Sequence, residues 1–493
     1  MTQPRIRRNE WQVLVAPALG SWTPTLSVSV VVPAYDAGRL LPTVLAGLAA
    51  QTYPDHLLEV VVVDDGPGAL VLPDVRPENT RLVRPRQGWG RANACHAGAL
   101  AADGDVLHWL DADMLVERHE VEAQARWHHL LDHVVVLGDK WFVDPGPVLA
   151  LTPQHVYDAV GRDGLDELFG DREPHAWVEE VYDRTDRLRL AGWNALRTHT
   201  GATASVGAGL YRESGGLDVD LRLGEDIALG SRLAHQGAVF VPDAEARSWH
   251  LGRTHVMERR DRVNAYNDPF LAERAPSLRA KRHPGRTYRT PYLEVVLDAH
   301  GHAADAVTAA VDAVLASTLH DLAVTLVGPW STLHDDRDDV LGDAAYDVRV
   351  VHTTYADEPR ARLVEAAPTT PSDAAFRLVL PGPHVAPRPP ALEKALLHLE
   401  HTHEGLRLVE LDDGTQVRIE RTAAVNRARR LVAPGEHLDD VVHEVAGART
   451  MPAKRAGFGP SADVRPRHYP RTGGPPVDGE EAWARIRKTF DAR

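Results

Sequence analysis

The sequence predicts an α/β protein built from two doubly wound domains in tandem. Short apolar, β-branched runs alternate with helical patterns in residues 26–288, as in a parallel sheet covered by helices. The same order of runs returns in residues 289–450, with matching segments roughly 265–270 residues apart. Acidic pairs end two runs of the first copy, at the place where α/β sheets bind ligands. These observations place a candidate site in the first domain.

The first copy opens with the apolar run at 28–32, which Pro33 ends and which we expect to be a buried strand. Leu41, Leu45 and Leu48 then recur at helical spacing. The next run, LEVVVVDDG, is short, continuous and β-branched. A run of this kind is typical of a parallel strand that is buried on both faces.

Two further strands and a helix complete the predicted sheet. RLVRP is a short strand, GRANACHAGALAADGD reads as a helix, and LHWLDADMLV at 107–116 is the next strand. The acidic pairs Asp64/Asp65 and Asp111/Asp113 end two of the strands. Because the carboxyl ends of parallel strands lie at one edge of a sheet, we expect the two pairs to lie near each other.

The second copy repeats the strands without the acids. YLEVVLDAHG (292–301), LAVTLVGPWS and FRLVLPGPHV (376–385) follow the same order as the strands of the first copy. Gly-Pro at 328–329 stands in the place of residues 64–65, and Pro-Gly-Pro at 381–383 in the place of residues 111–113. We therefore expect a degenerate domain that keeps the fold for packing, acceptor binding or oligomerisation.

Four segments follow from these patterns. Residues 1–25 are an N-terminal extension, 26–288 the first domain, 289–450 the second, and 451–493 a Pro/Gly-rich arm with a short terminal helix. A Pro- and Arg-rich stretch separates the two strand systems.

Composition excludes several classes of protein. The net charge of −15 argues against a protein that coats nucleic acid. Cys95 is the single cysteine, so no internal disulfide can form. We read no signal peptide and no run of about 18 apolar residues that could cross a membrane. We expect a cytoplasmic protein, a location compatible with peripheral contact at the inner membrane face and with a homo-oligomer.

Two acids at alternate positions after a strand suit a hard divalent cation. Mg²⁺ and Mn²⁺ prefer oxygen ligands and are commonly completed by substrate phosphates. Asp-x-Asp alone is more often a solvated loop end. The apolar surroundings of Asp111 and Asp113 favour a site, because burying carboxylates without partners is costly.

A second acidic pair opens a later helix. Glu225 and Asp226 follow Gly224, and the helix dipole is a plain structural reason for acids in a first turn. The functional interpretation is a general base. His250 follows another apolar strand and could be a third metal ligand, although 26 histidines make any single one a weak signal.

The ordered motifs resemble family 2 glycosyltransferases with the GT-A fold. They are VSVVVPAYDAG, EVVVVDDG, GRANACHAGALAADGDVLHWLDADM, GGLD, GEDIALGSRL and SWH, over residues 26–256. The tandem layout also resembles that of bacterial chondroitin-polymerase-type enzymes.

The resemblance implies a role for each matching residue. The base and ribose would be lined by Pro33, Ala34, Tyr35 and Asp36, and the base would be contacted by Asp64 and Asp65. The nucleotide would lie near Gly90 and Arg91, with Arg91 reaching phosphate. The D-x-D motif would be formed by Asp111, Ala112 and Asp113. Asp111, Asp113 and His250 would bind Mg²⁺ or Mn²⁺, with Asp226 as general base and Glu225 as the neighbour that orients the acceptor.

The implied reaction is inverting transfer of a hexosyl or N-acetylhexosaminyl group from a nucleotide sugar, expected to be a UDP-sugar, to a glycan or glycoconjugate hydroxyl. Two other classes stay open. A nucleotidyltransferase shares metal carboxylates and a nucleotide-binding α/β fold, but VVVPAYDAG lacks the basic residues of a triphosphate loop. A glycan-binding or scaffold protein would not need Asp111, Asp113, Asp226 and His250 together.

Overall fold

The computed structural model describes residues 3–279, 285–334, 339, 341–368 and 372–464. The strands of the first half are β1 (Val28–Ala34), β2 (Leu58–Asp64), β3 (Thr80–Val83), β4 (Val106–Leu110), β5 (Met114–Val116), β6 (Val134–Val143), β7 (Arg172–Pro174), β8 (Thr203–Gly207) and β9 (Val239–Leu251). Its helices are α1 (Leu41–Ala49), α2 (Arg91–Ala101), α3 (Glu120–His128), α4 (Gly146–Leu149), α5 (Pro153–Gly161), α6 (Ala176–Thr185), α7 (Ala208–Glu213), α8 (Glu225–His235) and α9 (His255–Arg274).

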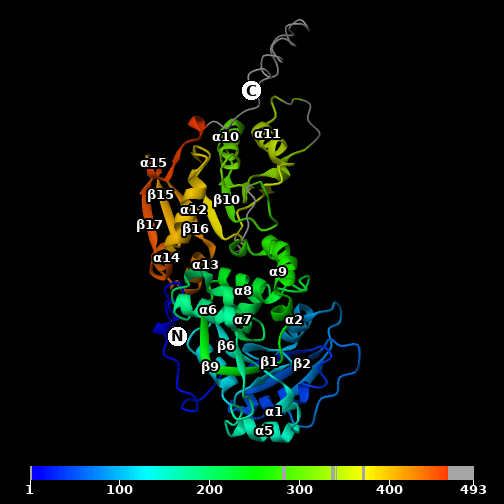
Figure 1. Ribbon diagram of the computed structural model, residues 1–493. Helices are drawn as coiled ribbons and strands as arrows, with labels where there is room; N and C mark the ends of the chain where they lie inside the picture. The colour runs from blue at the N-terminus through cyan, green and yellow to red at the C-terminus, as the bar shows by residue number, and fades with distance from the viewer. Residues whose placement is uncertain (1–2, 280–284, 335–338, 340, 369–371, 465–493) are drawn as a thin grey trace, which may run out of the picture.

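The second half has its own strands and helices (Figure 1). The strands are β10 (Leu293–Asp298), β11 (Leu322–Val327), β12 (Ala361–Val364), β13 (Phe376–Val379), β14 (Val385–Pro387), β15 (Leu406–Glu410), β16 (Gln416–Arg421), β17 (Ala448–Pro452) and β18 (Phe458–Pro460). The helices are α10 (Ala304–Leu315), α11 (Tyr346–Tyr355), α12 (Ala391–Thr402), α13 (Thr422–Leu431), α14 (Leu438–Ala446) and α15 (Ala453–Ala456).

The first sheet is mixed and rich in parallel strands, as predicted. Its order is β3-β2-β1-β4-β8-β6-β9-β5, with β7 paired to β6. β1 runs parallel to β2 and β4, whereas β8 is antiparallel to β4 and β6. Their continuous apolar sequences make β2 and β4 buried along their whole length.

Alternate side chains of β1 pack against helices on opposite faces of the sheet. Val30 and Val32 share a core cluster with Leu45 of α1, and Val31 shares another with Ala94 of α2. On the α2 face the two layers are very close. A Cβ added at Gly98 of α2 would lie 2.4 Å from Val31 Cγ1.

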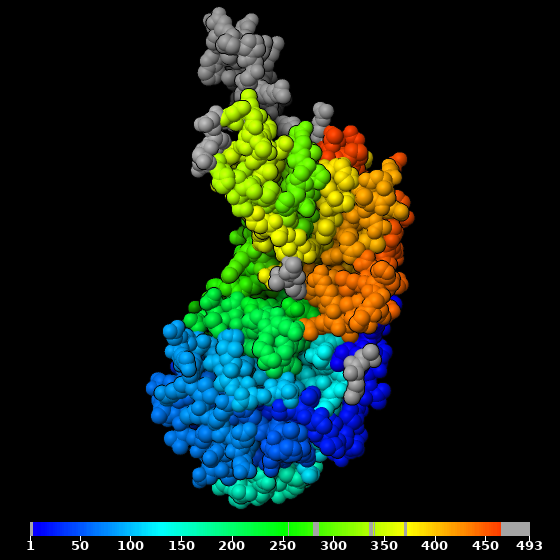
Figure 2. All heavy atoms as spheres, turned by 180° about the vertical axis from the view of Figure 1, so that it is seen from behind, coloured from blue at the N-terminus to red at the C-terminus, as the bar shows by residue number. Residues whose placement is uncertain are grey.

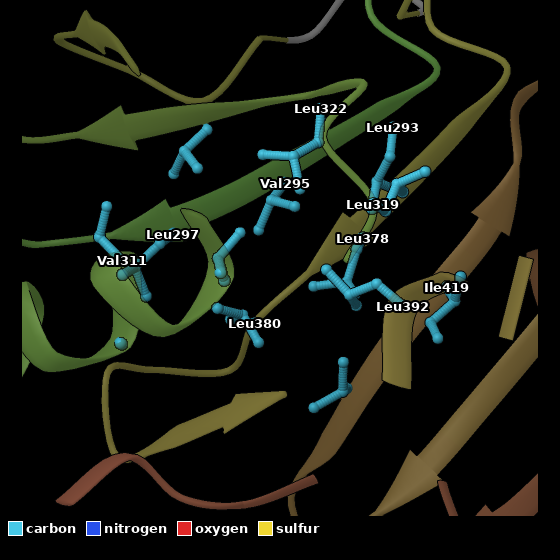
Figure 3. Close-up of a cluster of buried hydrophobic side chains, with 14 of the residues drawn as sticks. Leu293, Val295, Leu297, Val311, Leu319, Leu322, Leu378, Leu380, Leu392 and Ile419 are labelled. Atoms are coloured by element: carbon cyan, nitrogen blue, oxygen red, sulfur yellow. The ribbon is translucent and has the colours of Figure 1, made fainter. Parts of the chain in front are cut away.

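The second sheet repeats the strand order of the first. Its order is β12-β11-β10-β13-β16-β15-β17, which matches β3-β2-β1-β4-β8-β6-β9 strand for strand along the chain. The pairing directions agree as well: three parallel pairs, two antiparallel pairs and a final parallel pair. The core lies where β10, β11 and β13 meet α10 and α12, with side chains such as Leu293, Val311 and Leu392 (Figure 3).

The N-terminal extension lies between the two domains. The backbone N–H of Arg8 donates to the carbonyl of Val445 at 2.7 Å, and Asn9 Nδ2 donates to Phe240 O at 2.9 Å. Figure 2 shows the N-terminal segment, in blue, against the orange part of the second domain. Within the described ranges, no helix combines the length and the apolar composition needed to cross a membrane.

The predicted arm contains sheet residues at its start. β17 continues to Pro452 beside β15, and β18 pairs with β14, so the predicted division at 450/451 crosses a strand. The predicted terminal helix lies outside the described residues.

Gly98→Val tests the close packing of α2 on β1. We expect the free energy of unfolding to fall by about 2–3 kcal/mol, because the new side chain overlaps Val31 and Val63. Urea unfolding followed by circular dichroism measures the change. Gly68→Val is the control, because no atom lies within 4 Å of the Cβ position at Gly68. Equal stability of the two variants would contradict the packing argument.

Candidate active site

The acidic residues predicted from the strand ends meet at one edge of the first sheet. β1 and β2 end at Ala34 and Asp64, and β4 ends at Leu110, just before the first acid of the D-x-D motif. α2 and α8 begin at the same edge, with Arg91 and Glu225. The site is therefore built from strand ends and helix starts, as expected for an α/β sheet.

Arg91 joins the D-x-D motif to α8. Its Nε and Nη2 donate to Asp111 Oδ1 at 2.9 and 2.7 Å, its Nη1 to Glu225 Oε1 at 2.9 Å, and its Nη2 also to the Gly201 carbonyl at 2.6 Å. Burial alone would lower the pKa of Arg91, but the carboxylates of Asp111, Glu225 and Asp226 raise it well above its ordinary value. The guanidinium thus stays charged and is engaged with protein groups, whereas the resemblance implied a contact with phosphate.

The pairing of β5 with β9 brings His250 to Asp113. Met114 is the register partner of His250, and His250 Nε2 lies 3.7 Å from Asp113 Oδ2. The carbonyl of Gly252 accepts from His250 Nδ1 at 3.0 Å, so in a neutral imidazole the Nε2 lone pair faces the carboxylate. Burial and the charge of Asp111 raise the pKa of Asp113, and His250 opposes this shift.

A divalent cation fits between Asp113 and His250. Asp113 Oδ1 is a buried oxygen without a hydrogen-bond partner in the described structure, and carboxylate oxygen and imidazole nitrogen both bind Mn²⁺ and related ions. The predicted triad does not form, because Asp111 is bound to Arg91 and no group of three His, Cys, Asp or Glu among the described residues is placed to hold a metal. Ala112 packs against the apolar core behind the motif.

Asp226 is the more accessible of the two acids that open α8. Its Oδ2 accepts from the Gly201 N–H at 3.2 Å, its Oδ1 from the next backbone N–H at 2.8 Å, and its carbonyl from His199 Nδ1 at 2.7 Å. Glu225 is buried, and burial together with the charge of Asp226 raises its pKa against the effect of Arg91. Glu225 is therefore engaged in the ion pair with Arg91, whereas the carboxylate of Asp226 accepts hydrogen bonds from backbone N–H groups.

Asp64, the last residue of β2, and Asp65, which follows it, also differ in their burial and partners. Asp64 is buried and binds Arg84 Nη2 at 2.6 Å. Burial raises its pKa, but hydrogen bonds from Arg84 and from two backbone N–H groups outweigh burial and lower the pKa overall. Asp65 accepts from the Gly90 N–H at 2.9 Å, and burial raises its pKa. Asp64 thus shapes the loop, whereas Asp65 lies beside the start of α2.

Two exposed aromatic rings stand on the predicted nucleotide side. Residues 33–34 end β1, and Tyr35 and Asp36 follow on the surface. Tyr35 is 58% exposed and Trp89 is 54% exposed, with ring centroids 6.2 Å apart. The Arg222 guanidinium lies 5.5 Å from the Trp89 ring. Such rings can stack on a base. Sequence reasoning missed Trp89, although the residue directly precedes Gly90.

Lys140 on β6 was also missed. It is 8% exposed, and its Nζ donates to Thr200 Oγ1 at 3.2 Å. Burial lowers the pKa of Lys140 to about 8. With Thr198 and Tyr182 it lines a cavity of about 10 Å³, room for about one water or hydroxyl group. Thr200 precedes Gly201, so the cavity lies beside Asp226. The available signal was a lysine inside the mostly apolar run VVVLGDKWFV.

Comparisons with known sequences find similarity to glycosyltransferases. Residues 29–197 match the family described as Glycosyl transferase family 2. The chain is 29% identical over 296 residues to a validoxylamine A glucosyltransferase of Streptomyces hygroscopicus subsp. limoneus, covering 56% of this chain and 63% of that protein. It is 30% identical over 280 residues to the protein of the same name from subsp. jinggangensis (strain 5008), covering 53% and 64%. The chain thus spans less than two thirds of these relatives.

Solved structures with similarity to the chain are also glycosyltransferases. The mannosyltransferase PcManGT of Pyrobaculum calidifontis, in complex with GDP-Man and Mn²⁺, has a TM-score of 0.35 and 19% identity over 53% of this chain and 67% of its own. A fragment of S. aureus TarS in complex with UDP-GlcNAc has a TM-score of 0.33 and 16% identity, covering 46% and 59%.

The family match includes Asp111 and Asp113 and ends before Asp226 and His250, which the fold brings to the same edge. Residues 29–197 of this chain are a glycosyl transferase family 2 domain.

Proposed function

We propose that the first domain transfers a sugar from a nucleotide sugar to a hydroxyl of a glycan or glycoconjugate, with inversion at the anomeric carbon. The junction at Arg91 is the observation that supports this most. It ties the D-x-D motif to the start of α8, so that the Asp113/His250 pair and Asp226 lie along one edge of the sheet. One side of this edge suits a diphosphate and the other suits an acceptor.

The donor side combines stacking surfaces with a cation site. Tyr35 and Trp89 offer rings to the base, and Asp65 lies beside the start of α2. Asp113 and His250 would hold Mg²⁺ or Mn²⁺, which when bound neutralises negative charge on the leaving diphosphate. A UDP-sugar remains the expected donor. The two curated relatives are named as glucosyltransferases, which favours a glucosyl group.

Asp226 is the proposed general base. As the acceptor oxygen forms its bond to the anomeric carbon, the bond from that carbon to the diphosphate breaks and the hydroxyl proton passes to Asp226. Backbone N–H groups hold both carboxylate oxygens of Asp226 in one orientation. This arrangement favours an acceptor that approaches from the side of Gly201 and the Lys140 cavity.

A covalent intermediate is not part of the proposal. Cys95 is fully buried, and burial raises the pKa of its thiol to about 12, so the thiol stays neutral and unreactive near neutral pH. A single displacement by the acceptor inverts the anomeric carbon.

We propose that the second domain does not bind a nucleotide sugar. Its sheet has the strand order of the first, but Gly328-Pro329 follows β11 and Pro381-Gly382-Pro383 follows β13, where the first sheet has its acids. Asp298 at the end of β10 is exposed and bound to His300 at 2.7 Å. The histidine–carboxylate pairs His300–Asp298 and His384–Asp413 of this domain are exposed, whereas His250 of the first domain is buried.

Asp226→Asn tests the base. We expect kcat for transfer to fall by about 10²–10⁴-fold, because the amide cannot take the proton. A panel of UDP-, GDP- and dTDP-sugars with Mn²⁺, scored for nucleotide release with and without glycan acceptors, provides the assay. Nucleotide affinity should stay within about twofold of wild type, and Asp220→Asn, an exposed acid of the preceding loop, should keep full turnover. Intact turnover in Asp226→Asn would exclude this base.

Lys140→Met tests the acceptor side. We propose that the ammonium donates to an acceptor oxygen, so we expect the acceptor KM of the variant to rise about tenfold while donor hydrolysis without acceptor is unchanged. Because the pKa of Lys140 is about 8, wild-type acceptor KM should rise above that pH and the variant should lose this dependence. Steady-state kinetics between pH 6.5 and 9 measure both effects. An unchanged acceptor KM with weaker donor binding would place Lys140 on the donor side instead.

A further inference from the structure

The second domain caps the helix that carries the proposed base. The carbonyl of His235, the last residue of α8, and those of residues 236–238 in the turn that follows accept hydrogen bonds from three side chains of α13. The pairs are His235 O with Asn426 Nδ2 at 2.7 Å, Gln236 O with Arg430 Nε at 3.0 Å, Gly237 O with Arg427 Nε at 2.7 Å, and Ala238 O with Arg427 Nη2 at 2.7 Å. Carbonyls at a helix end lack partners within the helix and need such donors.

Arg427 is buried entirely among carbonyl groups. It is 1% exposed, and its Nη1 also donates to the carbonyls of Ile6, at 3.1 Å, and Arg8. Its guanidinium lies 4.8 Å from the ring centroid of Trp193. Burial lowers the pKa of Arg427 to about 9, with no carboxylate acting against this shift. The negative end of the α8 dipole is therefore one of the few favourable partners of this cation.

α13 packs closely against the turn that follows α8. Gly237 has φ +87°, and a Cβ there would lie 2.7 Å from the backbone N and Cα of Arg427. Trp193 of the first domain packs into an apolar cluster of the second domain, and its Nε1 donates to His403 O at 3.1 Å. The two domains are thus joined by close packing and directed hydrogen bonds at this point.

The opposite end of α8 holds the proposed base. The helix has 11 residues and is about 16 Å long, so its two ends move together. At its start, Glu225 binds Arg91 and Asp226 binds the Gly201 N–H. A shift at the capped end would change where Asp226 meets an acceptor hydroxyl.

We propose that Arg427, with Asn426 and Arg430, is a positioning group for sugar transfer: through α8, the second domain sets the place of Asp226. The inference rests on the proposed function of Asp226. It gives the second domain a part in the reaction that needs neither a nucleotide nor a glycan bound to that domain. We expect nucleotide binding, which involves Asp65 and the start of α2 rather than the end of α8, to be unaffected by this cap.

The test uses the full chain with Arg427→Met, Arg427→Lys and Asn426→Ala. Arg418→Met is the matched control, because Arg418 forms its ion pair with Asp439 inside the second domain, at 2.7 Å. Transfer kcat is measured with UDP-glucose, or with the donor that the panel identifies, and UDP affinity with Mn²⁺ by calorimetry. We expect Arg427→Met to lower kcat about ten- to hundredfold with UDP affinity within about twofold. Arg427→Lys should recover part of kcat, and Asn426→Ala should lower it a few fold.

Three results would overturn the inference. They are wild-type kcat in folded Arg427→Met, an equal loss of kcat in Arg418→Met, and a parallel loss of kcat and UDP affinity. If Arg427→Met does not fold, the same measurements of kcat and UDP affinity are made on Asn426→Ala and Arg430→Met, and wild-type kcat in both overturns the inference. If Asp226→Asn lowers kcat but the cap variants do not, the inference alone fails. If Asp226→Asn leaves kcat intact, the proposed function fails.

Discussion

The site depends on one guanidinium, that of Arg91. It is anchored at the first residue of α2 and binds Asp111 after β4, Glu225 at the start of α8, and the carbonyl of Gly201 between them. Gly201 and Glu225 lie 110 and 134 residues from Arg91 along the chain, and Asp111 lies 20 residues from it. Carboxylates at a partly buried sheet edge repel one another, and Arg91 opposes the effect that the charge of Asp226 has on its neighbour Glu225. In this arrangement Asp111 Oδ1 is occupied by Arg91.

Much of this arrangement could be predicted from the sequence because strand ends in α/β sheets have a fixed place. The runs before Asp64 and Asp111 indicated buried parallel strands, and their acids do meet at one edge. The family match over residues 29–197 and the α/β architecture of the two sheets agree with the prediction. The ion-pair partners of these acids could not be predicted from the sequence. Arg91 binds Glu225 because the first residues of α2 and α8 meet, and Asp64 is paired with Arg84, which follows the neighbouring strand β3. The positions of Lys140 and Trp89 in the site depend on contacts between distant parts of the chain, which leave no local sequence pattern.

The two domains share a strand order and differ in what their strand ends carry. In the first sheet, acids stand at the ends of β2 and β4, and in the second, glycine and proline stand at the same places. The second domain instead contacts the first through α13, whose side chains satisfy the carbonyls that α8 leaves open. The base-bearing helix is thus fixed at one end by Arg91 and at the other by Arg427.

The central claim is that Arg91 is a structural tie and that the cation is held by Asp113 and His250. A crystal structure of the chain with UDP and Mn²⁺ tests this directly, because anomalous scattering locates manganese. The account predicts an anomalous peak within coordination distance of Asp113 and His250, with Arg91 still bound to Asp111 and Glu225. A peak coordinated by Asp111, with Arg91 turned toward the diphosphate, would contradict it.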